Sequence, residues 1–239
     1  MSEAAPEKPT AKSRPKWETA ARDTLRTHLR KFSKPLTDLV ARDANEGDTR
    51  LLVTDMLCDA LGYDKYADLT TEYAVKGEFA DYGVRIDQQL VAFIEVKRVT
   101  TKLTQRHLRQ VEMYSVNEGV EWLILTNGVV WQVYRLIPGM PVTIDLVIEV
   151  DLLDDSSTLT KKVEKLFFLS KESLKRGQIE AVWQEAAATS PKALAEALLS
   201  DAPLDALRKE VRRRTGVNID IADLGRLIRD GVLLPELSK

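Results

Sequence analysis

The sequence is poor in the residues and segments that mark secreted, membrane-bound or histidine-based metal proteins. It contains one cysteine, Cys58, among 239 residues, so no disulfide can form within the chain and a cytoplasmic location is expected. No apolar run approaches the ~18 residues that a membrane span needs, and no signal peptide is present, so we expect no membrane partner. The two histidines are far apart in the sequence, which argues against a histidine-based metal site.

The chain also lacks a strong charge of either sign and the signature of a nucleotide-driven motor. The formal net charge is -2, so any contact with a nucleic acid has to use local basic patches. The pattern G-x-x-x-x-G-K-[ST] is absent, so we expect no P-loop site for a nucleotide triphosphate. Apolar content of 44% and charged content of 30% are typical of an ordinary globular protein.

The predicted elements indicate a mixed α/β domain followed by an all-helical region. Residues 1–16 show no periodicity and are expected to form a disordered tail. Residues 17–153 begin with helices, and a break is expected at Ser33-Lys34-Pro35 because proline removes a backbone donor. Residues 154–239 are predicted to be helical. Strands are predicted near residues 71–75, 81–86, 90–97, 121–126, 129–136 and 142–150, with a helix near 104–117.

Glu95 and Lys97 stand at the end of an apolar predicted strand. Residues two apart in a strand point to the same face, so these side chains project together. A carboxylate beside an ammonium in this position is costly unless the two pair or bind something. Asp81 opens the preceding strand, so the turn between the two strands decides whether Asp81 meets Glu95.

The turn at residues 87–89 sets the register of these strands. A three-residue turn places Asp81 opposite Glu95. A two-residue turn places Asp81 opposite Val96, because a slip of one residue reverses the faces. The hydrophobic alternation favours the three-residue turn, and we therefore expect the three polar groups on one face at one end of the hairpin.

These groups admit two interpretations from the residues alone. Two close carboxylates repel each other unless a cation lies between them, and their hard oxygen atoms suit Mg²⁺ or Mn²⁺. A neighbouring lysine such as Lys97 can then polarise a metal-bound water for attack on phosphorus. Alternatively, Lys97 forms an ion pair with Glu95 or Asp81 on a half-covered sheet, and the E-x-K pattern by itself favours this second interpretation.

Further motifs give the pattern a family resemblance. Gln110 and Tyr114 form a Q-x-x-x-Y pair on one face of the next helix. With Asp81, Ile94-Glu95-Val96-Lys97 and the predicted element order, this pair resembles the αβββαβ core of the PD-(D/E)xK nuclease superfamily. Residues 43–136 resemble the N-terminal nuclease domain of type I restriction enzyme R (motor) subunits. The segments that share this resemblance are Leu61-Gly62-Tyr63, Leu125-Thr126-Asn127-Gly128 and Trp131-Gln132-Val133-Tyr134.

The resemblance implies a divalent-metal-dependent DNA phosphodiesterase of the endonuclease type, acting in restriction-modification or DNA processing. It implies Mg²⁺ or Mn²⁺ as cofactor, with Asp81 and Glu95 as metal ligands and the Val96 carbonyl as a further ligand. Glu46 matches an acidic residue that completes such a site, and Glu72 is a competing candidate. A purely structural role for Glu46 near a helix N-terminus stays open. The catalytic residues implied are Asp81, Glu95 and Lys97.

DNA is the expected partner, and its contacts are expected on the segment that leaves the strand. The resemblance implies that Gln110 and Tyr114 contact the DNA backbone or support the site. Arg98, Lys102 and Arg106 form the basic segment that leads out of it.

The missing P-loop separates this chain from a complete motor subunit. It is expected to be a stand-alone version of the nuclease domain with its own helical region, which covers a sheet face or forms a homodimer interface. The alternative is a nuclease fold that no longer cuts and serves in nucleic-acid binding or protein assembly.

Overall fold

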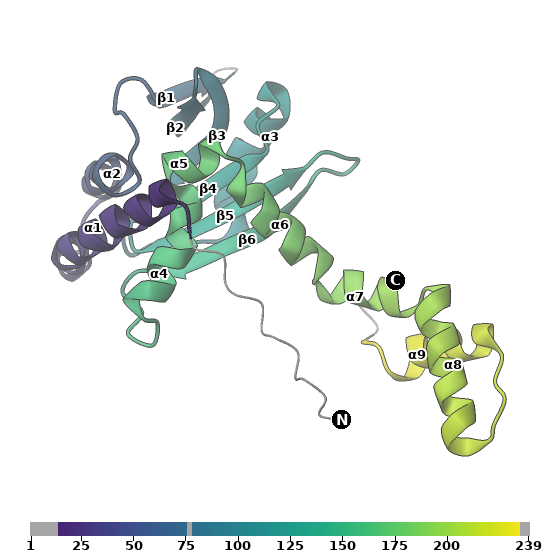
Figure 1. Cartoon of the computed structure of the whole chain (residues 1–239). Coiled ribbons are helices and arrows are strands. Elements are labelled where there is room, and N and C mark those ends of the chain that lie inside the picture. Colours follow the sequence, from purple (N-terminus) through teal and green to yellow (C-terminus); the bar gives the residue numbers. More distant parts are fainter. Residues whose placement is uncertain (1–13, 76–77, 235–239) are drawn as a thin grey trace, which may run out of the picture. The chain divides into compact units, whose positions relative to one another are not determined.

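Six strands form one mixed sheet in the order β1-β2-β3-β4-β5-β6 (Figure 1). The computed structural model describes residues 14–75 and 78–234. β3 and β4 pair in parallel across a helical crossover, whereas the other neighbouring strands pair antiparallel. β6 lies at one edge of the sheet. The strands are β1 Leu69–Val75, β2 Glu78–Ile86, β3 Gln89–Val96, β4 Trp122–Thr126, β5 Val130–Ile137 and β6 Thr143–Asp151.

Helices cover both faces of this sheet (Figure 1). α3 packs on the face that carries Phe93 and Leu123. α2 lies on the other face, where the hydroxyls of Thr54 and Tyr82 are 2.8 Å apart. The order α2-β1-β2-β3-α3-β4 is the predicted αβββαβ core. The helices before residue 179 are α1 Lys16–Ala41, α2 Glu46–Asp55 with the π-helical Met56–Ala60, α3 Arg109–Glu118 after the 3-10 helix Gln105–Leu108, α4 Leu159–Leu166 with the 3-10 helix Phe167–Leu169, and α5 Lys171–Lys175.

The chain divides into two units at Ile179, with the sheet in the first unit and helices in the second. The helical region predicted from residue 154 is therefore shared between the units. The predicted tail 1–16 lies largely outside the described residues, and α1 begins at Lys16. No helix in the described ranges is long and apolar enough to cross a membrane. The remaining helices are α6 Gln178–Ala188, α7 Pro191–Leu198, α8 Asp201–Thr215 and α9 Ile221–Gly231.

The break predicted at Ser33-Lys34-Pro35 is wrong, because α1 runs through Pro35 without interruption. Proline removes one backbone hydrogen bond from a helix. Leu36 and Leu39 on the following turns are buried at 1% and 7% exposure. Their burial stabilises a continuous helix by more than the lost hydrogen bond costs.

The three-residue turn predicted between β2 and β3 is also wrong, yet Asp81 still aligns with Glu95 as expected. Ile86 pairs with Gln89 across the two residues Asp87 and Gln88, whose φ values of 50° and 69° are those of a type I′ turn. This two-residue turn alone would place Asp81 opposite Ile94. A bulge between Val84 and Arg85, where β3 carries one extra residue, restores the register, so that Tyr82 pairs with Ile94.

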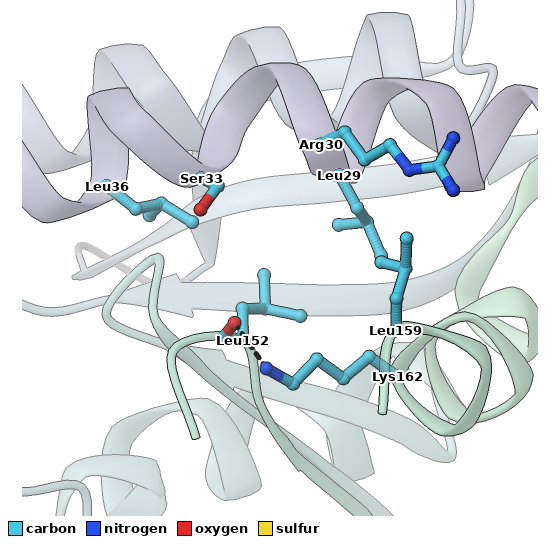
Figure 2. Close-up of a pocket in the computed structure, with 7 residues that line it drawn as sticks. All are labelled: Leu29, Arg30, Ser33, Leu36, Leu152, Leu159 and Lys162. Atoms are coloured by element: carbon cyan, nitrogen blue, oxygen red, sulfur yellow. Dashed lines mark hydrogen bonds between the residues drawn. The ribbon is translucent and has the colours of Figure 1, made fainter. Parts of the chain in front are cut away.

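A small cavity of about 240 Å³ separates α1 from α4 and the segment after β6 (Figure 2). Four leucines line it, together with Arg30, Ser33 and Lys162. The Lys162 ammonium donates a hydrogen bond to the Leu152 carbonyl at 2.8 Å. None of the predicted site residues lines this cavity, so it reflects the packing of α1 and not the candidate site.

Candidate active site

The end of β3 carries a buried acid–base pair. Glu95 is only 7% exposed, and the Lys97 ammonium donates a hydrogen bond to its Oε1 at 2.6 Å. Burial raises the pKa of the Glu95 carboxyl, and the charge of Asp81 raises it further against the effect of Lys97. Burial lowers the pKa of Lys97, but the bond to Glu95 and the nearby carboxylates outweigh it, so that this pKa is raised. Lys97 therefore carries a positive charge at neutral pH.

Asp81 joins this pair from β2. Continuing the register from Tyr82 and Ile94 by one residue places Asp81 opposite Glu95, as predicted. Its Oδ2 accepts a hydrogen bond from the Val96 backbone N–H at 2.7 Å. The Asp81 carboxylate is thus fixed against the strand that carries the acid–base pair, and its negative charge acts on Glu95.

α2 brings a third carboxylate and a second cation to the strand end. Asn45 caps this helix, because its Oδ1 accepts from the Asp48 N–H at 2.9 Å. Glu46 follows at the first helical position, and its charge raises the pKa values of both Glu95 and Lys97. Glu46 therefore lies within electrostatic reach of the strand end.

Arg50 is the site residue that sequence reasoning missed. Its Nη1 lies 3.0 Å from Asp81 Oδ1 and 3.9 Å from Glu72 Oε1. Positions four apart share a helix face, so Arg50 comes to the site together with Glu46. The spacing of four positions between Glu46 and Arg50 is the sequence signal that could have identified Arg50 as a site residue. Glu72, the competing candidate, contacts this arginine at 3.9 Å and leaves 72% of its side chain exposed, at a residue whose φ is 49°.

The donor chemistry of the strand end fits a hard divalent cation. Asp81 and Glu46 both lie within electrostatic reach of Glu95 there, and carboxylate oxygens are the ligands that Mg²⁺ and Mn²⁺ prefer. Burial is the main cause of the raised pKa of Glu95, and the negative charges of Asp81 and Glu46 add to it. Within the described residues, no three His, Cys, Asp or Glu side chains form a ready-made metal cluster. Any ion would therefore need other ligands, such as water or a backbone carbonyl.

The residues predicted to contact nucleic acid fall into three groups. Arg98 is paired with the Asp43 carboxylate and also donates to the Asp43 carbonyl at 3.1 Å. Lys102 and Arg106 are exposed, and no carboxylate in the described ranges pairs with either of them. Gln110 and Tyr114 lie on the backbone of α3, but their side chains are outside the described part of the structure.

The central part of the chain is similar to a known protein family. Residues 45–140 match the family described as type I restriction enzyme R protein N terminus. The matched segment starts at the cap of α2 and ends after β5, so it contains Glu46, Arg50, Asp81, Glu95 and Lys97. Comparisons with curated proteins and with solved structures find no match. The segment from residue 45 to 140 is similar to the N-terminal nuclease domain of type I restriction enzyme R proteins, which confirms the resemblance predicted from the sequence and indicates a nuclease-related role.

Proposed function

We propose that this protein hydrolyses DNA phosphodiester bonds with the help of a divalent metal ion. One observation carries the proposal. Asp81, Glu95 and Lys97 meet at one end of the β2–β3 hairpin, inside the segment that is similar to a restriction-enzyme domain. The same three residue types scattered over the surface would support no more than ordinary ion pairs.

Asp81 and Glu95 would hold the metal ion, which is Mg²⁺ or Mn²⁺, with the Val96 carbonyl and Glu46 as further ligands. The bound ion would polarise a phosphate oxygen and lower the pKa of a water. The hydrogen bond from the Val96 N–H keeps Asp81 in place for this role. Burial of Glu95 keeps bulk water away from its carboxylate, which strengthens its attraction to a cation.

Lys97 would orient the attacking water and stabilise negative charge on the phosphate. Its ammonium is held at 2.6 Å by Glu95, so its position is fixed before the substrate arrives. Lys97 retains 23% exposure of its side chain, which leaves donor capacity toward the solvent side. A charged lysine at this point has no acceptor role, so it can assist the water only by donating hydrogen bonds.

The DNA backbone would lie along the segment that follows β3. Lys102 and Arg106 are exposed cations without a described carboxylate partner, so they can neutralise phosphates at no cost in broken ion pairs. Arg98 would have to leave Asp43 before it could do so. Gln110 and Tyr114 are proposed to contact the backbone or support the site from α3. We place this activity in the cytoplasm, in restriction or DNA processing.

A second candidate function is a silent nuclease fold that binds DNA or another protein without cutting. Two contacts favour it, because Asp81 is already paired with Arg50 and Glu95 with Lys97. In this case the four side chains would be a closed ion-paired cluster that stabilises the hairpin.

Incubation of plasmid and linear DNA with Mg²⁺ or Mn²⁺ tests the first function against the second. Wild type is compared with Glu95→Ala and Lys97→Ala, and with Lys161→Ala as an exposed lysine control on α4. Cleavage that is lost in the two site variants and kept in the control supports the nuclease. Cleavage that survives both site variants comes from a contaminant, and DNA binding without cleavage supports the silent fold.

A further inference from the structure

A hollow of about 620 Å³ opens beside the candidate active site, between α2 and β1. Arg50 belongs to both places, because its guanidinium contacts Asp81 at 3.0 Å and also lines the hollow. Lys65 contributes a second cation to the lining, and Asp55 and Glu72 contribute two carboxylates. Leu51 provides an apolar surface there and is 68% exposed. The hollow therefore combines charged side chains of both signs with an apolar patch directly next to Asp81.

The turn that carries Lys65 is held rigidly by backbone hydrogen bonds. Asp64 Oδ1 accepts from the N–H groups of Tyr66 and Ala67 at 2.9 and 2.8 Å, and the Asp64 N–H donates to Asp68 at 2.7 Å. Tyr66 follows Lys65 directly and is 89% exposed. An aromatic ring on a rigid turn, adjacent to a cation, is a typical support for an unpaired base.

We propose that this hollow binds one unpaired nucleotide of the DNA strand that is cut, next to the scissile phosphate. The inference rests on the proposed function, and it adds a substrate class: DNA with a single-stranded stretch at the cut. A cavity of this volume has the size of a site for one small molecule, which suits a nucleotide and not a base-paired duplex.

Each part of the nucleotide has a matching group. Arg50 and Lys65 provide the positive charge for a phosphate. Glu72, which also lines the hollow, can accept a hydrogen bond from the exocyclic amino group of a base. Leu51 offers apolar contact, and Tyr66 offers a ring on which a neighbouring base can stack.

Fluorescence anisotropy in EDTA tests the inference without any cleavage. The probes are a labelled DNA single strand of about 15 nucleotides, within the range of single-strand site sizes, and the duplex of the same sequence. Wild type is compared with Tyr66→Ala, Tyr66→Phe and Lys65→Ala, and with Lys161→Ala as the control for loss of an exposed lysine. Thermal melting of each variant checks that the exposed substitutions leave the fold intact.

Wild type is expected to bind the single strand more tightly than the duplex. Tyr66→Ala should weaken single-strand binding by about fivefold or more, whereas Tyr66→Phe keeps the ring and should stay within about twofold of wild type. Lys65→Ala should lower the slope of log affinity against log salt by about 0.7 on the single strand, while Lys161→Ala leaves it unchanged.

Single-strand affinity that is the same in wild type, Tyr66→Ala and Lys65→Ala overturns the subsite. If Glu95-dependent cleavage is observed alongside that result, the subsite fails while the nuclease function stands. If the two variants lose single-strand affinity but wild type never cuts DNA, the subsite stands and the nuclease function fails.

Discussion

Removal of the cation that accompanies the buried Glu95 is the sharpest test of how the candidate site is held together. Lys97→Met keeps most of the apolar stem of the side chain and removes the ammonium. The carboxylate of Glu95, a residue that is 7% exposed as a whole, then loses the hydrogen bond that it accepts at 2.6 Å. Asp81 and Glu46 still act on it with like charge. A buried charge without its partner is strongly destabilising.

The expected loss of stability follows from the exposure of the pair. Removing one partner of a fully buried ion pair costs about 3–5 kcal/mol. Lys97 keeps 23% and Glu95 10% of its side chain exposed, so we expect the low end, about 3 kcal/mol at pH 7. For a unit of this size, each kcal/mol lowers the melting temperature by about 2–4 °C, which gives a decrease of about 6–12 °C.

The pH dependence of this loss has a definite sign. Burial already raises the pKa of Glu95 above its ordinary value of 4.5, and loss of the lysine raises it further. A carboxyl with a raised pKa in the folded state binds protons more readily folded than unfolded. The destabilisation in Lys97→Met should therefore be complete above the raised pKa, shrink as the pH falls through it, and vanish below about 4.5.

Urea denaturation and thermal melting at several pH values measure the effect against wild type. Glu95→Gln/Lys97→Met removes both charges and should recover most of the lost stability, to within about 1 kcal/mol of wild type at pH 7. Equal stability of Lys97→Met and wild type at pH 7 would show that the pair does not hold the strand end. A loss that stays constant with pH would refute the assigned role of the Glu95 carboxylate.

Three further predictions concern other parts of the first unit. Arg50→Met should tighten Mg²⁺ binding by about fivefold in isothermal titration calorimetry, because the guanidinium no longer occupies Asp81 Oδ1 at 3.0 Å; weaker binding contradicts it. Gly83→Ala should cost about 1–3 kcal/mol in urea denaturation, since its Cβ would lie 2.7 Å from Tyr73 Cδ2. Arg22→Met should cost about 3–5 kcal/mol, because this buried guanidinium bridges two carboxylates at 2.9 and 2.6 Å; an unchanged denaturation midpoint argues against such a bridge.

Local sequence patterns carry most of the secondary structure of this protein. Apolar alternation, apolar runs and turn residues predicted six strands that each lie within a few residues of an observed strand. These signals depend on neighbours within a few positions, so they are visible in one dimension. Pro35 is the counterexample, because the helix through it is held by the burial of Leu36 and Leu39, which the sequence does not show.

The candidate site shows where local patterns stop being sufficient. The sequence by itself determined that Glu95 and Lys97 share a face at a buried strand end, because a strand has a period of two. Only the tertiary structure decided that Asp81 joins them, since a bulge corrects the register that the two-residue turn would impose. It also decided that Arg50 reaches Asp81, a contact across 31 positions that no local periodicity specifies. Such a contact depends on how α2 packs on the sheet, and packing is a property of the whole folded chain.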